Sequence, residues 1–280
     1  MGFRMGIVGL PNVGKSTLFN ALTKTAAAQA ANFPFCTIEP NVGEVAVPDP
    51  RLDKLAGIAG SKQIIPTRIT FVDIAGLVKG ASKGEGLGNQ FLANIREVDA
   101  IAHVLRCFED GDVTHVEGRV DPIADAETIE TELMIADLES IERRLANIQR
   151  KLKGGDKEAV AQEKLLKAAQ AALESGRPAR TVEVADEDRK AWDMLQLLTA
   201  KPVLFVCNVE EDKAATGNSQ SERVAQMAAE QGAGHVVISA RIEEEISQLP
   251  AEEATMFLEE MGLHEAGLDR LIREGYKLLG

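Results

Sequence analysis

The sequence of 280 residues predicts an α/β fold in which a P-loop domain carries an inserted α-helical hairpin. Short apolar runs typical of buried strands recur along the chain, and helical patterns separate most of them. These runs lie at residues 3–8, 68–72, 100–107, 202–207 and 235–239. A glycine-rich loop follows the first run, and the hydrophobic spacing changes to that of paired helices between the third run and the fourth.

The glycine-rich loop fits the phosphate-binding pattern G-x-x-x-x-G-K-[ST], because residues 9–16 read Gly-Leu-Pro-Asn-Val-Gly-Lys-Ser. A strand before it and a helix over 17–24 supply the context that this motif requires. Amides at the start of a helix attract phosphate, and the lysine and serine reach the β- and γ-phosphates and Mg²⁺. The loop therefore predicts a nucleoside triphosphate ligand, bound by Asn12, Val13, Gly14, Lys15, Ser16 and Thr17.

A second motif predicts the rest of a magnesium site. Residues 71–76 read Phe-Val-Asp-Ile-Ala-Gly, a strand that ends in D-x-x-G. In such sites the aspartate, here Asp73, holds Mg²⁺ through water, and the amide of Gly76 contacts the γ-phosphate. Thr37 is the natural second hydroxyl ligand, although it also fits an ordinary loop threonine. We therefore expect Ser16, Thr37 and Asp73 to bind Mg²⁺.

The long segment between the third and fourth strands predicts two paired helices. Leu138, Ile141, Leu145, Ile148 and Leu152 are spaced by 3, 4, 3 and 4 residues, as in a helical hairpin or coiled coil. Glycines at 154 and 155 end the first helix, and Asp156 caps a second helix that ends near residue 173. The predicted organisation is a discontinuous P-loop domain, residues 1–127 and 200–280, with a helical hairpin at 128–199.

Charge and cysteine content narrow the class of protein. The net charge of −13 argues against a protein that coats bare nucleic acid or reads a specific DNA sequence. Residues 143–167, however, hold eight basic and three acidic residues, whereas residues 208–265 hold three basic and thirteen acidic ones. No run approaches the roughly 20 apolar residues of a membrane span. Cysteines 36, 107 and 207 lack metal-ligand spacing, and the opening strand leaves no room for a signal peptide, so we expect a cytoplasmic protein.

Residues 9–17, 33–41 and 73–90 together resemble the Obg-related translational GTPases, and within them the YchF subfamily of Obg-like ATPases. The resemblance covers essentially the whole chain, and it implies a Ras-like G domain with an inserted coiled coil and an association with ribosomes. Relatives continue past the helix near residues 268–279 into a small β-rich TGS domain, which this sequence lacks. We therefore expect it to be part of a longer chain.

The base-recognition motif departs from the guanine-specific pattern N-K-x-D. Residues 208–211 read Asn-Val-Glu-Glu, so Val209 replaces the lysine and Glu211 replaces the aspartate. The aspartate normally binds two guanine N–H groups, and adenine offers neither in that position. The substitution therefore favours ATP over GTP, as the resemblance to YchF also implies, with a degenerate GTPase motif as the alternative. Ser239 and Ala240 belong to a loop that resembles the S-A-K loop beside the base.

Catalysis also departs from the common GTPase pattern. Leu77 follows D-x-x-G where many GTPases place a water-orienting glutamine, and leucine cannot bind water. His115 matches the histidine proposed to act in YchF proteins, although an exposed loop histidine fits equally well. We therefore expect His115 and Lys15 to be the catalytic residues. Asn12 matches the pattern of cation-activated G proteins, so K⁺ beside the phosphates is a further hypothesis.

The leading interpretation is thus a Mg²⁺-dependent ATPase switch that associates with ribosomes through its basic hairpin. A GTPase of the same architecture is the first alternative. The second is an RNA- or ribosome-binding module in which Lys151, Lys153 and Lys157 dock and hydrolysis is incidental. Solvated helix lysines also fit this pattern.

Overall fold

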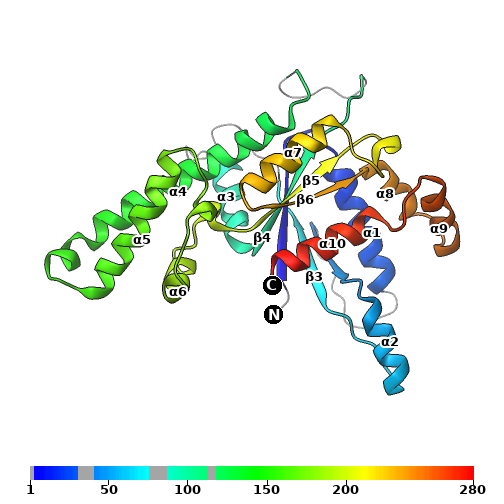
Figure 1. Cartoon of the computed structure of the whole chain (residues 1–280), viewed down its shortest axis with the longest axis horizontal. Helices are drawn as coiled ribbons and strands as arrows, with labels where there is room; N and C mark the ends of the chain where they lie inside the picture. The colour runs from blue at the N-terminus through cyan, green and yellow to red at the C-terminus, as the bar shows by residue number, and fades with distance from the viewer. Residues whose placement is uncertain (1–2, 31–40, 76–86, 112–117) are drawn as a thin grey trace.

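The protein is an α/β structure built on a twisted sheet, as predicted (Figure 1). In the computed structural model residues 3–30, 41–75, 87–111 and 118–280 are described. Within them the sheet contains β1 (Phe3–Val8), β2 (Val42–Ala46), β3 (Arg68–Asp73), β4 (Ala100–Arg106), β5 (Val203–Asn208) and β6 (Gly234–Ile238). The strand order is β2-β3-β1-β4-β5-β6, and every neighbouring pair is parallel except β2 and β3. The carboxyl ends of five strands therefore meet at one edge.

Five of these strands match the predicted runs to within a residue at each end. β2 was not predicted. It is an edge strand paired antiparallel with β3, and its residues alternate between buried and half-buried side chains. It extends the sheet beyond β3.

Helices cover both faces of the sheet. They are α1 (Lys15–Ala30), α2 (Pro50–Ala59), α3 (Leu87–Glu97), α4 (Pro122–Lys153), α5 (Lys157–Glu174), α6 (Arg189–Asp193), α7 (Ser219–Glu230), α8 (Ala240–Ile246), α9 (Ala251–Glu260) and α10 (Gly267–Leu278). Short 3₁₀ helices lie at η2 (Ala179–Thr181), η3 (Asp186–Asp188), η4 (Leu198–Ala200) and η5 (Glu211–Lys213). α10 packs against β4, β5 and β6, and α7 packs against β5 and β6. None of the helices in the described ranges is long and apolar enough to cross a membrane.

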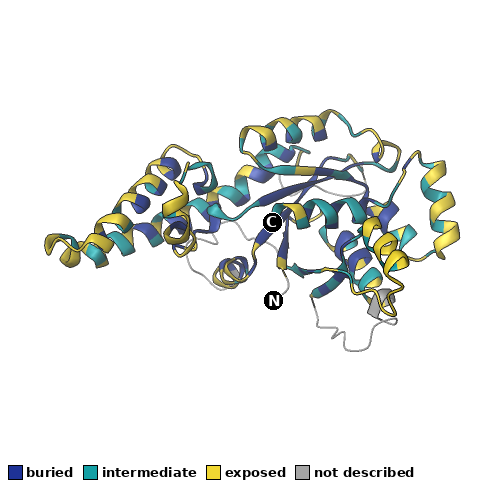
Figure 2. Cartoon of the chain, turned by 60° about the horizontal axis from the view of Figure 1, so that its bottom comes forward, coloured by how far each residue is buried: buried dark blue, intermediate teal, exposed yellow. Residues whose placement is uncertain are grey.

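The longest helix, α4, belongs to two hydrophobic cores. It begins at Pro122 with Asp121 as its cap, and Ile129 and Leu133 join the core around the sheet. About two turns further along, Ile141 joins a second core with residues of α5 and with Trp192. Of the residues spaced by 3 and 4 in the sequence, Leu138, Leu145 and Ile148 also pack on this second core. The outer sides of α4 and α5 are exposed (Figure 2).

The turn of the hairpin forms where the glycine pair predicts it. α4 ends at Lys153, and Gly155 takes a left-handed conformation with φ of 74°. Asp156 then caps α5 by accepting a hydrogen bond of 2.9 Å from the amide of Ala159. The structure confirms an inserted helical hairpin. The domain limits at 127/128 and 199/200 stay a prediction, because α4 is continuous across the first of them.

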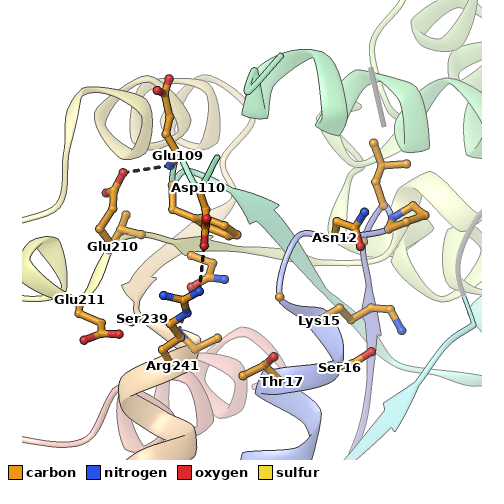
Figure 3. A pocket seen from close by; sticks show the side chains of 18 of the residues that line it. Asn12, Lys15, Ser16, Thr17, Glu109, Asp110, Glu210, Glu211, Ser239 and Arg241 are labelled. Atoms are coloured by element: carbon orange, nitrogen blue, oxygen red, sulfur yellow. Dashed lines mark hydrogen bonds and ion pairs between the residues drawn. The ribbon is translucent and has the colours of Figure 1, made fainter. Parts of the chain in front are cut away.

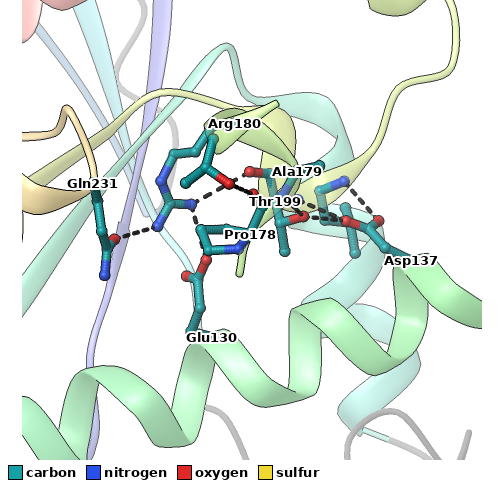
Figure 4. A network of polar contacts seen from close by, with 9 residues as sticks. Glu130, Asp137, Pro178, Ala179, Arg180, Thr199 and Gln231 are labelled. Carbon is teal, nitrogen blue, oxygen red and sulfur yellow. Dashed lines mark hydrogen bonds and ion pairs between the residues drawn. The ribbon is translucent and has the colours of Figure 1, made fainter. Parts of the chain in front are cut away.

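A buried polar network joins α4 to the segment that leads into β5 (Figure 4). Asp137, only 2% exposed, accepts hydrogen bonds from the amides of Leu198 and Thr199 at 2.8 and 2.9 Å and from the Thr199 hydroxyl at 2.7 Å. Arg180 forms an ion pair of 2.9 Å with Glu130 and donates to the side chain of Gln231. We call these residues the hairpin root. They bind the hairpin to the sheet domain at one place.

Three residues of the predicted apolar runs that carry titratable groups are buried. His103 lies in the core beside Phe205, and burial lowers the pKa of its imidazole to about 3. Cys107 and Cys207 are buried free thiols, and the contact with Cys207, together with burial, raises the pKa of the Cys107 thiol. Cys36 lies outside the described residues.

Candidate functional site

A cavity of about 750 Å³ opens at the carboxyl ends of β1, β4, β5 and β6. The phosphate loop lines one end, and the loops after β4, β5 and β6 line the other (Figure 3). Ten of the predicted nucleotide-binding residues line it: Asn12, Gly14, Lys15, Ser16, Thr17, Asn208, Val209, Glu211, Ser239 and Ala240. In open sheets of this kind, ligands bind at the carboxyl ends of the strands. The cavity is large enough for a nucleotide.

The backbone of the phosphate loop requires its glycine at position 14. Gly14 has φ of 92°, and a Cβ atom there would lie 2.2 Å from the side-chain nitrogen of Asn208. Asn12 is also left-handed, with φ of 64°, a conformation that asparagine tolerates better than most residues. The loop then turns into α1, where the amide of Leu18 donates to the carbonyl of Gly14. The first amides of α1 are therefore directed at the cavity, as phosphate binding requires.

The phosphate end brings together a cation and a carboxylate from separate motifs. The ammonium of Lys15, at the start of α1, contacts the carboxylate of Asp73, at the end of β3. Both side chains are mostly buried, at 13% and 19% exposure. Ser16 follows Lys15 at the cavity. A serine hydroxyl and a carboxylate are the hard oxygen ligands that Mg²⁺ prefers, so the donor set present fits this ion.

Asn208 is a link between three loops. Its side-chain nitrogen donates to the carbonyl of Val13 at 3.0 Å, and its side-chain oxygen accepts from the amide of Ala240 at 2.9 Å. The residue is only 5% exposed. Asn208 therefore fixes the distance between the phosphate loop and the loop after β6. Val13 is 1% exposed and contributes through its carbonyl.

The second residue of the base motif, Val209, directly follows β5 at the carboxyl end of the sheet. Its side chain is 3% exposed, and its amide donates to the carbonyl of Ile238 at 2.9 Å. That N–H is therefore already engaged. Glu211 begins η5 and is half-buried at the cavity. Ser239 is the cap of α8, accepting a hydrogen bond from the amide of Ile242.

Two side chains that the sequence did not single out hold the wall of the cavity after β4. Glu210 accepts a hydrogen bond of 3.1 Å from the amide of Glu109 and one of 3.0 Å from the side chain of Asn218. Arg106 is buried, lies 4.6 Å from the ring centre of Phe108, and donates to the Phe108 carbonyl. Phe108 and Glu109 line the cavity, so both contacts shape its base end.

An ion pair crosses the opening at the base end. Arg241, which follows Ala240, donates to the carboxylate of Asp110 at 2.8 Å (Figure 3). These residues follow β6 and β4, which lie on either side of β5. The pair therefore connects two loops that share no strand contact.

Known proteins resemble this chain closely. A family model described as "50S ribosome-binding GTPase" matches residues 4–137. "Ribosome-binding ATPase YchF" of Bacillus subtilis is 53% identical over 282 residues, which cover 100% of this chain and 77% of that protein. The protein of the same name from Haemophilus influenzae is 54% identical over 279 residues, covering 100% and 76%. The chain belongs to the YchF family.

A solved YchF structure agrees with this assignment. The Schizosaccharomyces pombe YchF GTPase superposes with a TM-score of 0.86 and 37% identity, covering 99% of this chain and 76% of the other. The resemblance seen in the sequence is thereby confirmed, together with the P-loop nucleoside triphosphatase class. This chain spans about three quarters of the length of these YchF proteins.

Four residues singled out in the sequence lie outside the described part of the chain. They are Thr37, Gly76, Leu77 and His115. The roles of Thr37 in metal binding, of Gly76 in γ-phosphate contact and of His115 in catalysis stay predictions. Within the described ranges, no group of three or more histidine, cysteine or acidic side chains could hold a metal ion. The magnesium site we expect uses two hydroxyl groups and one carboxylate, and so it is not a cluster of this type.

Proposed function

We propose that this YchF-family chain is a Mg²⁺-dependent ATPase that acts as a cytoplasmic nucleotide switch associated with ribosomes. The observation that carries the proposal is the cavity itself, with a phosphate loop at one end and a guanine motif altered at two positions at the other. The relatives from B. subtilis and H. influenzae are named ribosome-binding ATPases, which supports the same function.

The phosphate end supports triphosphate binding through charge. The Lys15 ammonium and the first amides of α1 hold the β- and γ-phosphates, and this arrangement stabilises charge that develops during transfer. Mg²⁺, when bound, neutralises phosphate charge, and Ser16 and Asp73 are the described residues that would hold it. Lys15 and Asp73 are in contact, so a lysine on the phosphates and a carboxylate on the ion are within reach of one ligand.

The base end supports adenine through what it lacks. Val209 is apolar and buried, so it cannot lie along guanine as the usual lysine does. Glu211 has a side chain one methylene longer than the usual aspartate. The carboxylate that would accept hydrogen bonds from guanine is therefore displaced, while Phe108 offers an apolar surface for either base. The S. pombe relative is titled a GTPase, so GTP is the alternative to test.

Calorimetry on this chain tests nucleotide choice. We expect ATP to bind more tightly than GTP when Mg²⁺ is present, and we expect Lys15→Ala to abolish both binding events. Omitting Mg²⁺ should weaken ATP binding. A clear preference for GTP would contradict our interpretation of Val209 and Glu211.

A separate hydrolysis assay tests whether Asn12 helps to bind K⁺ beside the phosphates, in which case hydrolysis should be faster in K⁺ than in Na⁺. Equal rates in K⁺ and in Na⁺ would contradict that role of Asn12.

The hairpin supports ribosome association through an exposed basic tip. Arg150, Lys151, Lys153 and Lys157 are exposed around the turn, far from the sheet along α4 (Figure 1). Polyanions such as ribosomal RNA bind such clusters by charge. Changing Lys151, Lys153 and Lys157 to glutamate should abolish co-sedimentation with ribosomes. The matched control changes Lys24, Lys54 and Lys62, which are also exposed but lie outside the hairpin.

The distance between the tip and the cavity favours a second candidate, a ribosome-binding module with incidental hydrolysis. The two candidate functions differ in whether ribosome binding depends on the bound nucleotide. If the ATPase switch is right, ATP and ADP should give different ribosome affinities, and Lys15→Ala should remove the difference. Equal binding in every nucleotide state would favour the module.

A further inference from the structure

The carboxylate of Glu243 joins the short helix α8 to the start of α10. Its two oxygens accept hydrogen bonds from the amides of Gly267 at 2.6 Å and of Leu268 at 3.2 Å. Glu243 is only 2% exposed. A Cβ atom on Gly267 would lie 2.4 Å from the nearer oxygen, so the approach depends on glycine. Unlike Glu245 on the same helix, which is exposed, Glu243 is directed into the protein.

α8 carries one wall of the cavity. Ser239, Ala240 and Arg241 line the base end and form the cap and first residues of this helix. α8 has only seven residues, and helices of that length are marginal without tertiary contacts. The amide of Glu243 donates to the carbonyl of Ser239, closing the first turn. A contact that fixes Glu243 therefore also fixes the loop before it.

α10 is a firm support for such a contact. Leu268, Leu271 and Ile272 are buried in the main core. Arg270 donates to the carbonyl of Val237 in β6 at 2.9 Å. Since buried side chains are closely packed, the first turn of α10 has a fixed position relative to the sheet. The hydrogen bonds between Glu243 and this turn therefore hold α8 in a fixed position as well.

We propose that Glu243 is a positioning residue for the base end of the nucleotide site. It acts through the Ser239–Arg241 loop and touches no ligand itself. The inference rests on the proposed function, since it takes the cavity to bind a nucleotide. It predicts a selective effect, because the loop after β6 faces the base, whereas the two hydrogen bonds of the Glu243 carboxylate go to α10 and not to the phosphate loop.

The test compares a ligand that has a base with one that does not. Affinities for MgATP and for magnesium tripolyphosphate are measured by calorimetry at about pH 8 on the full chain and on Glu243→Ala, Glu243→Gln and the control Glu245→Gln. Small misplacements of binding groups are costly, so we expect Glu243→Ala to weaken ATP binding roughly tenfold. Glutamine keeps one acceptor oxygen, so its loss should be roughly threefold. Tripolyphosphate should change less than about twofold in every variant, because it uses the phosphate loop alone.

A second variant approaches the same contact from the other side. Gly267→Ala keeps the carboxylate but places a methyl group where it lies, so it should show the same selective loss of ATP binding. It also replaces Glu243→Ala if that variant fails to fold. ATP binding by Glu243→Ala and Gly267→Ala that equals the control would overturn the inference. Equal losses for ATP and tripolyphosphate would overturn it too, because they indicate a general disturbance. If the unchanged chain binds tripolyphosphate but no nucleotide, the proposed function itself fails.

Discussion

Replacing Asp137 with alanine removes the central acceptor of the hairpin root. Three hydrogen bonds of 2.7 to 2.9 Å end on this carboxylate. The substitution leaves two amides and one hydroxyl without that acceptor in a place where Thr199 has no exposed surface. Asp137 lies between the parts of α4 that belong to the two cores. Its loss should therefore loosen the hairpin from the sheet domain.

The size of the effect follows from opposing contributions. Hydrogen bonds to a charged group contribute roughly 1.5–3 kcal/mol each. Burial opposes them, because it disfavours the charged form and raises the pKa of Asp137. We therefore expect Asp137→Ala to lower the free energy of unfolding by about 3 kcal/mol, well below the sum of three separate bonds. Asparagine keeps one acceptor oxygen, so Asp137→Asn should cost about half as much.

Urea unfolding followed by tryptophan fluorescence measures this effect directly. The chain has one tryptophan, and Trp192 is buried in the second core, so its emission reports on the hairpin. Circular dichroism on the same samples follows all helices. In Asp137→Ala the fluorescence transition should come at lower urea than the transition seen by circular dichroism. The control is Glu139→Ala, an exposed position two residues along the same helix. A change within about 0.5 kcal/mol of that control, the usual range for surface substitutions, would refute the reasoning.

Three further predictions concern other contacts. Burial raises the pKa of Glu243 from 4.5 to about 7, with Arg270 opposing the shift and Asp269 adding to it. A raised pKa stabilises the fold fully below the unfolded value of 4.5, and this contribution, about 3 kcal/mol, is lost as pH rises through 7. Glu243→Gln should therefore flatten the unfolding free energy between about pH 5 and pH 8, and an unchanged slope would count against the assignment. Gly14→Ala should weaken ATP binding at least roughly tenfold, because its methyl group meets Asn208. Gly60→Ala shares the left-handed backbone but has open space, so calorimetry should show its affinity unchanged. Arg180→Ala should cost roughly 3 kcal/mol by leaving the mostly buried Glu130 unpaired. The double variant with Glu130→Ala should recover part of that loss in urea unfolding, whereas strictly additive losses would exclude the coupling.

Local patterns in the sequence predict the parts of this fold that depend on neighbouring residues. The phosphate loop is such a part, because its glycines, its lysine and the start of the following helix lie within eight consecutive residues. The hairpin turn is another, since Gly155 and Asp156 act on adjacent backbone. β2 escaped prediction because Gly43 and Glu44 interrupt its apolar run, and its antiparallel pairing with β3 holds it in the sheet.

The parts that sequence could not predict depend on contacts between distant residues. Glu210 holds an amide 101 positions away, and nothing near it in the sequence indicates this. The motif drew attention to Glu211 because it occupies a known position, whereas Glu210 occupies a variable one. Asn208 was expected at the base, and its two hydrogen bonds to Val13 and Ala240 became visible only in the fold. Glu243 resembled its acidic neighbours until its burial was known.

Because α4 runs without a break from the sheet domain to the hairpin turn, a small rotation at its base moves the turn over a larger distance. From Asp137 to Lys153 the helix extends about 24 Å at 1.5 Å per residue. A rotation of about 10° at the hairpin root would thus carry the turn sideways by about 4 Å, enough to change which groups Lys151 and Lys153 can touch. A continuous helix transmits such a rotation, since its hydrogen bonds resist bending between the hairpin root and the turn. The stiffness of a few buried contacts around Asp137 thus sets how far a small displacement beside the sheet is amplified at the far end of the molecule.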